Sequence, residues 1–170
     1  MIWVKASDKG TLGLRMRKAF TLAEVVIVAA IIGILAAIVI PEFQSYAQQA
    51  KEAAAKDNLR ILRVAIERYV AEHNGIPPGY INNDPSRLAV SPGAGPAWSG
   101  QLVFNGKYLS ELPENPFNGK WETLFIENSE VFPGEPVSTD IYGWVYQPAT
   151  KTIRLNWAGT DSSGIAYFDY

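Results

Sequence analysis

A single acidic side chain lies inside an apolar stretch that is long enough to cross a membrane. From Phe20 to Ile40 the only ionisable residue is Glu24, and most of the others are Ile, Val, Leu and Ala. A carboxylate within a membrane span costs roughly 2.5–3.5 kcal/mol on insertion scales, and less towards the ends of the span. Such an acid is by default a functional-site hypothesis, and its chemistry is pairing with a positive charge. The alternative is that Glu24, being near the end of the span, only reaches back to the interface.

Other side chains that could carry chemistry are few. The chain has no cysteine, which excludes thiol catalysis, thiolate metal sites and disulfides. Its one histidine, His73, ends a predicted helix, where a basic residue suits the helix dipole. No phosphate-binding glycine loop is present. Hard oxygen ligands gather in residues 127–140, where Glu135, Asp140 and backbone carbonyls predict a calcium site, with an ordinary acidic loop as the alternative. We expect a protein that is not an enzyme.

The apolar stretch has the dimensions of a transmembrane helix. It contains about 21 residues and, at about 1.5 Å per residue, extends roughly 30 Å, the thickness of the bilayer core. It is longer than the apolar core of a secretory signal, about 7–15 residues, and the residues after it, Pro41-Glu42-Phe43, are not a small-residue cleavage site. We therefore expect it to stay on the protein, with a buried core helix as the alternative.

The charges on either side of the stretch predict its orientation. Residues 1–19 carry five basic and one acidic side chain, a net charge of +4, which leaves −6 for the remainder of the chain's net −2. By the positive-inside rule we expect the N-terminus to lie in the cytoplasm and the C-terminal part to lie across the membrane, with a single span between them. The acidic body argues against nucleic-acid binding.

The junction between the basic head and the apolar stretch resembles a known processing site. The segment Arg17-Lys18-Ala19-Phe20-Thr21-Leu22-Ala23-Glu24-Val25-Val26 is similar to the prepilin cleavage site of type IV pilins and type II secretion pseudopilins. The resemblance implies that a membrane aspartyl peptidase cuts between Ala19 and Phe20 on the cytoplasmic side and methylates the new amine of Phe20. Ala19 stands where that family usually has glycine. Pro41 falls where the family often has a helix-kinking proline.

Cleavage at this site would give Glu24 a partner. The new positive amine lies four residues from Glu24, which is one helical turn. The amine of one subunit can also pair with Glu24 of a neighbour, which would draw two helices together in lipid and fix their axial offset. We therefore expect Glu24 to act in assembly.

Residues 43–73 predict a continuation of the same helix. They contain no glycine or proline, and strong helix formers dominate. An apolar stripe recurs at helical spacing, followed by the stop signals Asn74-Gly75 and Pro77-Pro78-Gly79. The stripe consists of Leu59, Leu62, Ile66, Tyr69 and Val70. The charged residues between them predict a solvated face: Lys51, Glu52, Lys56, Asp57, Arg60, Arg63, Glu67, Arg68 and Glu72.

The remaining residues predict a loop followed by a small antiparallel sheet. Residues 74–100 are rich in Gly, Pro, Ser and Asn and indicate a surface loop, with room for a short element around Pro85-Ser86-Arg87-Leu88. Residues 101–112 indicate a short helix or strand. Strands are expected at 123–126, 141–147 and 152–157, and a last strand or a clamp at 165–170, with the sheet packed on the apolar stripe. The predicted fold is α+β, the pilin fold. Its parts are a cleaved leader (1–19), a transmembrane half-helix (20–40), an amphipathic half-helix (41–73) and a loop-plus-sheet region (74–170).

Two further segments resemble major pseudopilins. Leu112-Pro113-Glu114-Asn115-Pro116-Phe117-Asn118-Gly119 is similar to their Leu-Pro-x-Asp-Pro-Trp-Gly segment, with Asn115 for the acid and Phe117 for the tryptophan. Asp140-Ile141-Tyr142-Gly143-Trp144 is similar to the segment that follows their calcium loop, which adds to the calcium hypothesis for Glu135 and Asp140. Many type IV pilins staple their C-terminal region with a disulfide, so a chain without cysteine favours a pseudopilin.

The function that the resemblance implies is structural. The chain would be a subunit of a type II secretion pseudopilus, with prepilin peptidase/methyltransferase, an inner-membrane assembly platform with its ATPase, minor pseudopilins and further copies of itself as partners. The alternative is a type IV pilin of a surface pilus for adhesion, DNA uptake or motility. A different class is a signal-anchored binding or enzyme domain that never polymerises. In that case a ligand groove would be lined by Trp98, Trp121, Trp144 and Tyr170, which are more often sheet core.

Overall fold

The computed structural model describes residues 20–88 and 96–170. The chain divides into two units, Met1–Phe43 and Gln44–Tyr170. The α-helices are α1 (Leu22–Glu72) and α2 (Pro96–Val103), and the strands are β1 (Thr123–Phe125), β2 (Trp144–Gln147) and β3 (Thr152–Leu155). Short 3₁₀ turns occupy Ile81–Asn83, Phe104–Gly106 and Tyr167–Asp169.

The described part of the first unit consists mainly of the apolar half of α1. Nearly every side chain from Phe20 to Phe43 is exposed, including Ile34 at 66% and Ile38 at 64%. This helix is long and apolar enough to cross a membrane. Pro41 lies inside α1, and the helix is assigned without interruption through it. Whether Pro41 bends the helix stays a prediction.

The C-terminal end of α1 lies where the stop signals predict it. The helix ends at Glu72, one residue before the expected His73, which is within the usual uncertainty of helix ends. Asn74 and Gly75 have left-handed backbone angles, with φ of 54° and 83°. The backbone N–H of Gly75 donates to the carbonyl of Val70 at 3.0 Å, the closing bond of a Schellman cap.

The sheet in the second unit is mixed, so the expectation of a wholly antiparallel sheet was wrong for its first strand. The strand order is β1-β2-β3, with β1 parallel to β2 and β2 antiparallel to β3. A short turn joins β2 to β3 and must reverse the chain. The long connection from β1 to β2 instead returns the chain to the end of the sheet at which β1 begins. The two strands therefore run in the same direction, and Thr123 pairs with Trp144. For residues 165–170, the strand alternative is also wrong, because Tyr167–Asp169 forms a 3₁₀ turn.

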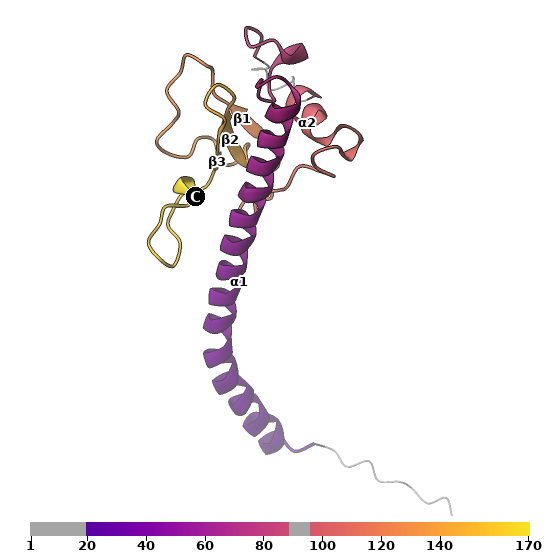
Figure 1. Ribbon diagram of the computed structural model, residues 1–170. Coiled ribbons are helices and arrows are strands. Elements are labelled where there is room, and N and C mark those ends of the chain that lie inside the picture. The colour runs from indigo at the N-terminus through magenta and orange to yellow at the C-terminus, as the bar shows by residue number, and fades with distance from the viewer. Residues whose placement is uncertain (1–19, 89–95) are drawn as a thin grey trace, which may run out of the picture. The chain divides into compact units, whose positions relative to one another are not determined.

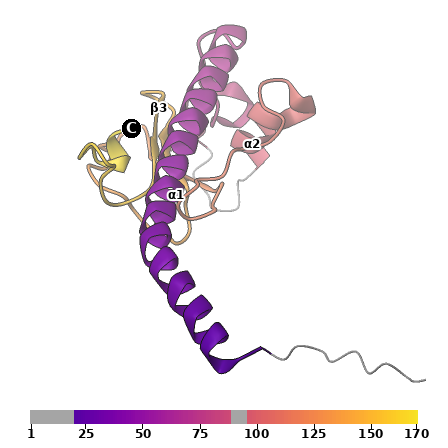
Figure 2. The same cartoon turned by 90° about the horizontal axis from the view of Figure 1, so that it is seen from below.

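The sheet packs on α1 through the predicted apolar stripe. Figures 1 and 2 both show the strands beside the second half of α1, with α2 also against this helix. The fully buried residues of this core come from α1, α2, β2 and β3: Leu59, Leu62, Ile66, Leu102, Trp144, Tyr146, Ile153 and Leu155. The prediction that the sheet covers the stripe is confirmed.

Two local predictions need correction. Glu52 was expected on the solvated face of the helix, but it is buried, with 6% of its surface exposed. It occupies the face that also carries the buried Ala55 and Leu59, so burial there follows from helical spacing. The expected surface loop at 74–100 contains a 3₁₀ turn and the start of α2, together with a bridge between Tyr80 and Leu88.

Candidate functional site

Glu24 is hydrogen-bonded at the very start of α1. Its carboxylate oxygen Oε2 accepts from the backbone N–H of Thr21 at 2.9 Å and from the Thr21 hydroxyl at 3.1 Å. The Thr21 Oγ1 in turn accepts from the backbone N–H of Glu24 at 3.2 Å. This reciprocal pair is a capping box, in which two backbone donors that a helix start would leave unpaired are both satisfied.

Thr21 is a site residue that the sequence analysis missed. The signal was present, because Thr21-Leu22-Ala23-Glu24 has the Thr-x-x-Glu spacing of a capping box directly before an apolar run. The cap gives the Glu24 carboxylate local partners within its own subunit. Glu24 is itself exposed, and so are Phe20 and Val25 on either side of it.

Of the other predicted residues of the processing site, the structure describes Phe20 but not Ala19. Ala19 and the whole leader 1–19 lie outside the described residues. Phe20 is the first residue described, and 85% of its surface is exposed. Cleavage between Ala19 and Phe20, methylation of Phe20 and the assembly role of Glu24 stay predictions.

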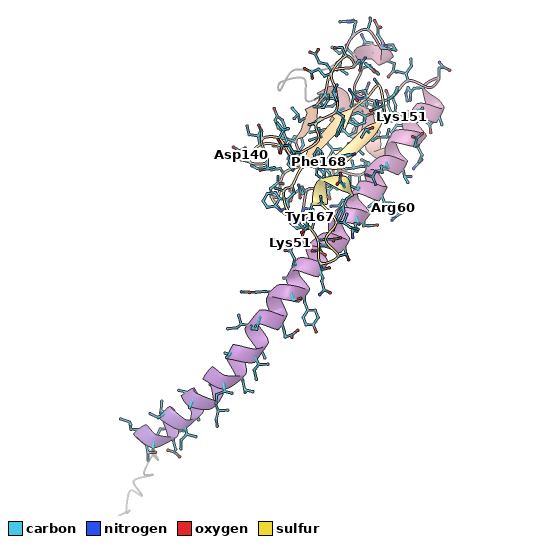
Figure 3. All side chains as sticks on the ribbon, turned by 90° about the vertical axis from the view of Figure 1, so that its left-hand side faces the viewer. Lys51, Arg60, Asp140, Lys151, Tyr167 and Phe168 are labelled. Carbon is cyan, nitrogen blue, oxygen red and sulfur yellow. The ribbon has the colours of Figure 1, made fainter. Side chains whose placement is uncertain are left out.

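A second polar constellation lies where the C-terminal segment meets α1. The Tyr167 hydroxyl donates to Oε1 of the buried Glu52 at 2.9 Å and accepts from Nε2 of Gln48 at 2.5 Å. The Ser162 hydroxyl donates to the other oxygen of Glu52 at 3.4 Å. Figure 3 shows Tyr167 beside α1, with Lys51 nearby on the helix. These bonds supply the partners that a buried carboxylate requires.

Asp161 binds the same segment to the next turn of α1. Its Oδ2 accepts from Lys56 Nζ at 3.2 Å and from the Tyr170 hydroxyl at 2.8 Å, and its Oδ1 accepts from the backbone N–H of Ile165 at 2.9 Å. The Ile165 bond, against the opposing effect of burial and with help from the Tyr170 and Lys56 donors, lowers the pKa of Asp161 to about 2. The carboxylate is therefore ionised at any physiological pH.

The predicted calcium ligands lie in the connection that precedes β2. Glu135 and Asp140 are both exposed. Within residues 20–88 and 96–170, no three acidic, histidine or cysteine side chains are grouped as a metal site would require. Backbone carbonyls of this connection have asparagine side chains as partners. Asn118 Nδ2 donates to the Thr139 carbonyl at 2.7 Å, and Asn156 Nδ2 to the Val137 carbonyl at 2.7 Å. The calcium site stays a prediction.

The four aromatic residues proposed for a ligand groove do not share one surface. Trp98 and Trp144 are buried at 4% and 1% exposure, and the Trp144 indole N–H donates to the Pro113 carbonyl at 2.9 Å. Trp121 is 46% exposed, and Tyr170 packs against Tyr167. For Trp98 and Trp144, the core placement is confirmed.

An exposed apolar helix at the N-terminus, an amphipathic continuation and a small mixed sheet on that continuation define the pilin class of fold. The family described as "Prokaryotic N-terminal methylation motif" matches residues 14–40. The type II secretion system core protein G of Pseudomonas aeruginosa is 29% identical over 113 residues, which cover 65% of this chain and 75% of that protein.

Two pilins match as well. The type IV major pilin protein PilE1 of Neisseria gonorrhoeae is 30% identical over 157 residues, covering 86% of this chain and 68% of that protein. The type IV major pilin protein PilA of Myxococcus xanthus is 47% identical over 55 residues, covering 32% of this chain and 25% of that protein. No solved structure matches. The chain belongs to the type IV pilin-like family and is a filament subunit of that kind.

Proposed function

We propose that this protein is a structural subunit of a type II secretion pseudopilus. It is made as a single-span protein of the bacterial inner membrane with a cytoplasmic N-terminus, and prepilin peptidase removes residues 1–19 and methylates Phe20. The trimmed subunits then associate helix to helix. The protein acts by assembly with other subunits and with the membrane platform and its ATPase, and it performs no catalysis.

The observation that carries the proposal is the exposed apolar half of α1 with one acid at its start. An exposed stripe can be covered by a single partner surface, but here the side chains are exposed around the whole helix. A helix of this kind requires lipid before assembly and neighbouring helices after it. Glu24 is the one group in it that lipid disfavours.

The capping box suggests how Glu24 acts in two stages. In the single subunit, the Thr21 N–H and hydroxyl supply donors to the carboxylate. These neutral donors leave its charge uncompensated, so a neighbour's Phe20 amine offers a stronger, charge-assisted bond. Exchange of partners would favour the assembled state over the dispersed one without requiring the helix cap to be rebuilt, because the Thr21 hydroxyl can still accept from the Glu24 N–H.

Two observations favour the secretion filament over a surface pilus. The match to core protein G extends beyond the N-terminal helix, over 113 residues. The chain also has no cysteine for a C-terminal staple. The match to PilE1, which covers 86% of the chain, favours the second candidate, a type IV pilin of a surface pilus.

Deletion of the gene in its own bacterium separates the two functions. We expect the secreted proteome to lose a defined set of proteins that accumulate in the periplasm, while surface pili remain. Complementation with the intact gene should restore secretion. Normal secretion combined with the loss of surface pili would reject the pseudopilin and support the pilin.

A further inference from the structure

Three asparagine side chains from two separate segments form hydrogen bonds with residues 137–143. Asn115 and Asn118 come from the loop before β1, and Asn156 follows β3. Asn115 and Asn156 are completely buried, and Asn118 is partly buried. Buried amides must be hydrogen-bonded, so their partners show what they are for.

Asn156 and Asn118 bind carbonyls of this connection with their amide nitrogens. Asn156 Nδ2 donates to the carbonyls of Val137 and Tyr142 at 2.7 and 2.9 Å. Asn118 Nδ2 donates to the carbonyls of Thr139 and Tyr142 at 2.7 and 3.1 Å. The Tyr142 carbonyl therefore accepts from both amides, one for each of its lone pairs.

The oxygen atoms of the same two amides accept hydrogen bonds from backbone N–H groups. Asn156 Oδ1 accepts from the Val137 N–H at 2.9 Å, and Asn118 Oδ1 accepts from the Lys120 N–H at 3.0 Å. Asn156 thus pairs with both polar groups of Val137, as a neighbouring strand would. Each amide is fixed at both ends.

Asn115 extends this arrangement to the start of β2. Its Nδ2 donates to the Gly143 carbonyl at 3.0 Å, and its Oδ1 accepts from the Phe117 N–H at 2.9 Å. Gly143 leaves no room for a side chain, because a Cβ there would lie 1.9 Å from the Lys120 carbonyl oxygen. The connection and the loop before β1 are therefore in direct backbone contact.

Carbonyls that converge in a loop repel one another unless a cation or hydrogen-bond donors lie between them. Calcium satisfies such carbonyls with a charge and requires 6–8 oxygen ligands. Here the amide N–H groups of Asn118 and Asn156 donate hydrogen bonds to the Val137, Thr139 and Tyr142 carbonyls. A cation that used the Tyr142 carbonyl would have to displace one of its two hydrogen bonds, and a cation at the Val137 or Thr139 carbonyl would have to share that oxygen with an amide donor.

We propose that the asparagine amides, and not a bound divalent cation, hold residues 137–143 in place. The proposal competes with the calcium site predicted for Glu135 and Asp140, and it does not depend on which filament the subunit builds. Its consequence is a subunit whose fold is the same in calcium-poor and calcium-rich surroundings.

The test is thermal unfolding of the full chain in detergent micelles, followed by near-ultraviolet circular dichroism, with excess EGTA or excess calcium. The wild-type melting temperature should differ by less than about 2 °C between the two conditions, since binding to the native state would raise it. A rise of several degrees in calcium overturns the proposal.

Matched charge variants test the amides directly. Asn118→Asp removes two donors and places a carboxylate against the carbonyls, so its melting temperature in EGTA should fall by roughly 5–15 °C. Asn105→Asp makes the same change at an exposed position of the same unit and serves as control. Failure of Asn118→Asp to fold while the control folds also supports the proposal. Equal melting temperatures for the two variants contradict it.

Discussion

Glu24 has partners inside its own subunit, and the proposed assembly would offer it a different one in a neighbour. Thr21 supplies two hydrogen bonds to the carboxylate, at 2.9 and 3.1 Å, which makes Glu24 part of the helix cap. A cap requires only an acceptor, whereas an intersubunit ion pair requires a negative charge. The two roles can therefore be separated by a substitution that keeps the acceptor and removes the charge.

Glu24→Gln is that substitution. Glutamine also serves in a capping box, so we expect normal membrane insertion and normal helix formation. Filament yield should fall at least tenfold, because loss of an ion pair in lipid exceeds the roughly 1.4 kcal/mol that corresponds to a factor of ten. Yield is measured by shearing and pelleting. Thr21→Val is the matched control for loss of the cap alone, and filaments of Glu24→Gln at the wild-type level would show that the charge is dispensable.

Tyr167 should be the most sensitive hydroxyl in the second unit. It is buried and donates to the buried Glu52 carboxylate. Tyr167→Phe leaves that carboxylate without its best donor, so the free energy of unfolding should fall by about 1–3 kcal/mol in urea denaturation. The control is Tyr46, which is exposed and lies on α1, as Glu52 does. Tyr46→Phe should leave the free energy of unfolding unchanged. Equal effects of the two substitutions would mean that Glu52 does not need this bond.

Asp161 should make the free energy of unfolding depend on pH between about pH 4 and pH 2. Its folded pKa of about 2 lies below the ordinary 3.8, so the carboxylate stabilises the fold above pH 3.8 and loses this effect as the pH falls through 2. The difference in unfolding free energy between wild type and Asp161→Asn should therefore be full at pH 6 and shrink between about pH 4 and pH 2. Urea titrations across this range measure it. A difference that stays constant down to pH 2 would contradict the pKa shift.

At the scale of elements, local periodicity was enough to predict α1 and the β2–β3 hairpin. The stripe from Leu59 to Tyr69 recurs every three or four residues, and in β3 the buried Ile153 and Leu155 alternate with partly exposed residues, so neighbours in the sequence carried the signal. The parallel pairing of β1 with β2 could not be predicted in this way. It depends on the path of the connection between them, and nothing in the three residues of β1 specifies a partner or a direction.

The candidate site was predictable to a similar extent. Glu24 stands out because its surroundings are apolar in the sequence itself. Glu52 does not, since its neighbours Lys51 and Ala53 are both exposed, and only the fold brings Tyr167 to it. The three asparagines were equally hidden, because each donates to a backbone carbonyl that is distant in the sequence.

Gly143, directly before β2, should be sensitive to substitution. It is buried where the connection enters β2, and a Cβ would meet the Lys120 carbonyl oxygen at 1.9 Å, so backbone would have to move. Gly143→Ala should lower the free energy of unfolding by about 1–3 kcal/mol or more. Gly100→Ala is the control, since a Cβ there meets nothing within 4 Å. Equal melting temperatures for the two variants would contradict the close contact.

At the scale of the whole molecule, the two units differ in what surrounds them. Gln44–Tyr170 has its own buried core, drawn from α1, α2 and the sheet, and is acidic overall. The described part of Met1–Phe43 has its apolar side chains exposed and requires lipid or other helices. An assembled filament provides such helices, which is why exposure at this scale agrees with membership of the pilin-like family.

The most direct test of the account is the intact mass of the chain recovered from sheared and pelleted filaments. One mass spectrum reports assembly and processing together, because only polymerised subunits enter the pellet. We predict the mass of residues 20–170 plus one methyl group, which places the cut between Ala19 and Phe20. A chain that still carries residues 1–19 in the pellet, or that never pellets when its leader has been removed, would contradict the account.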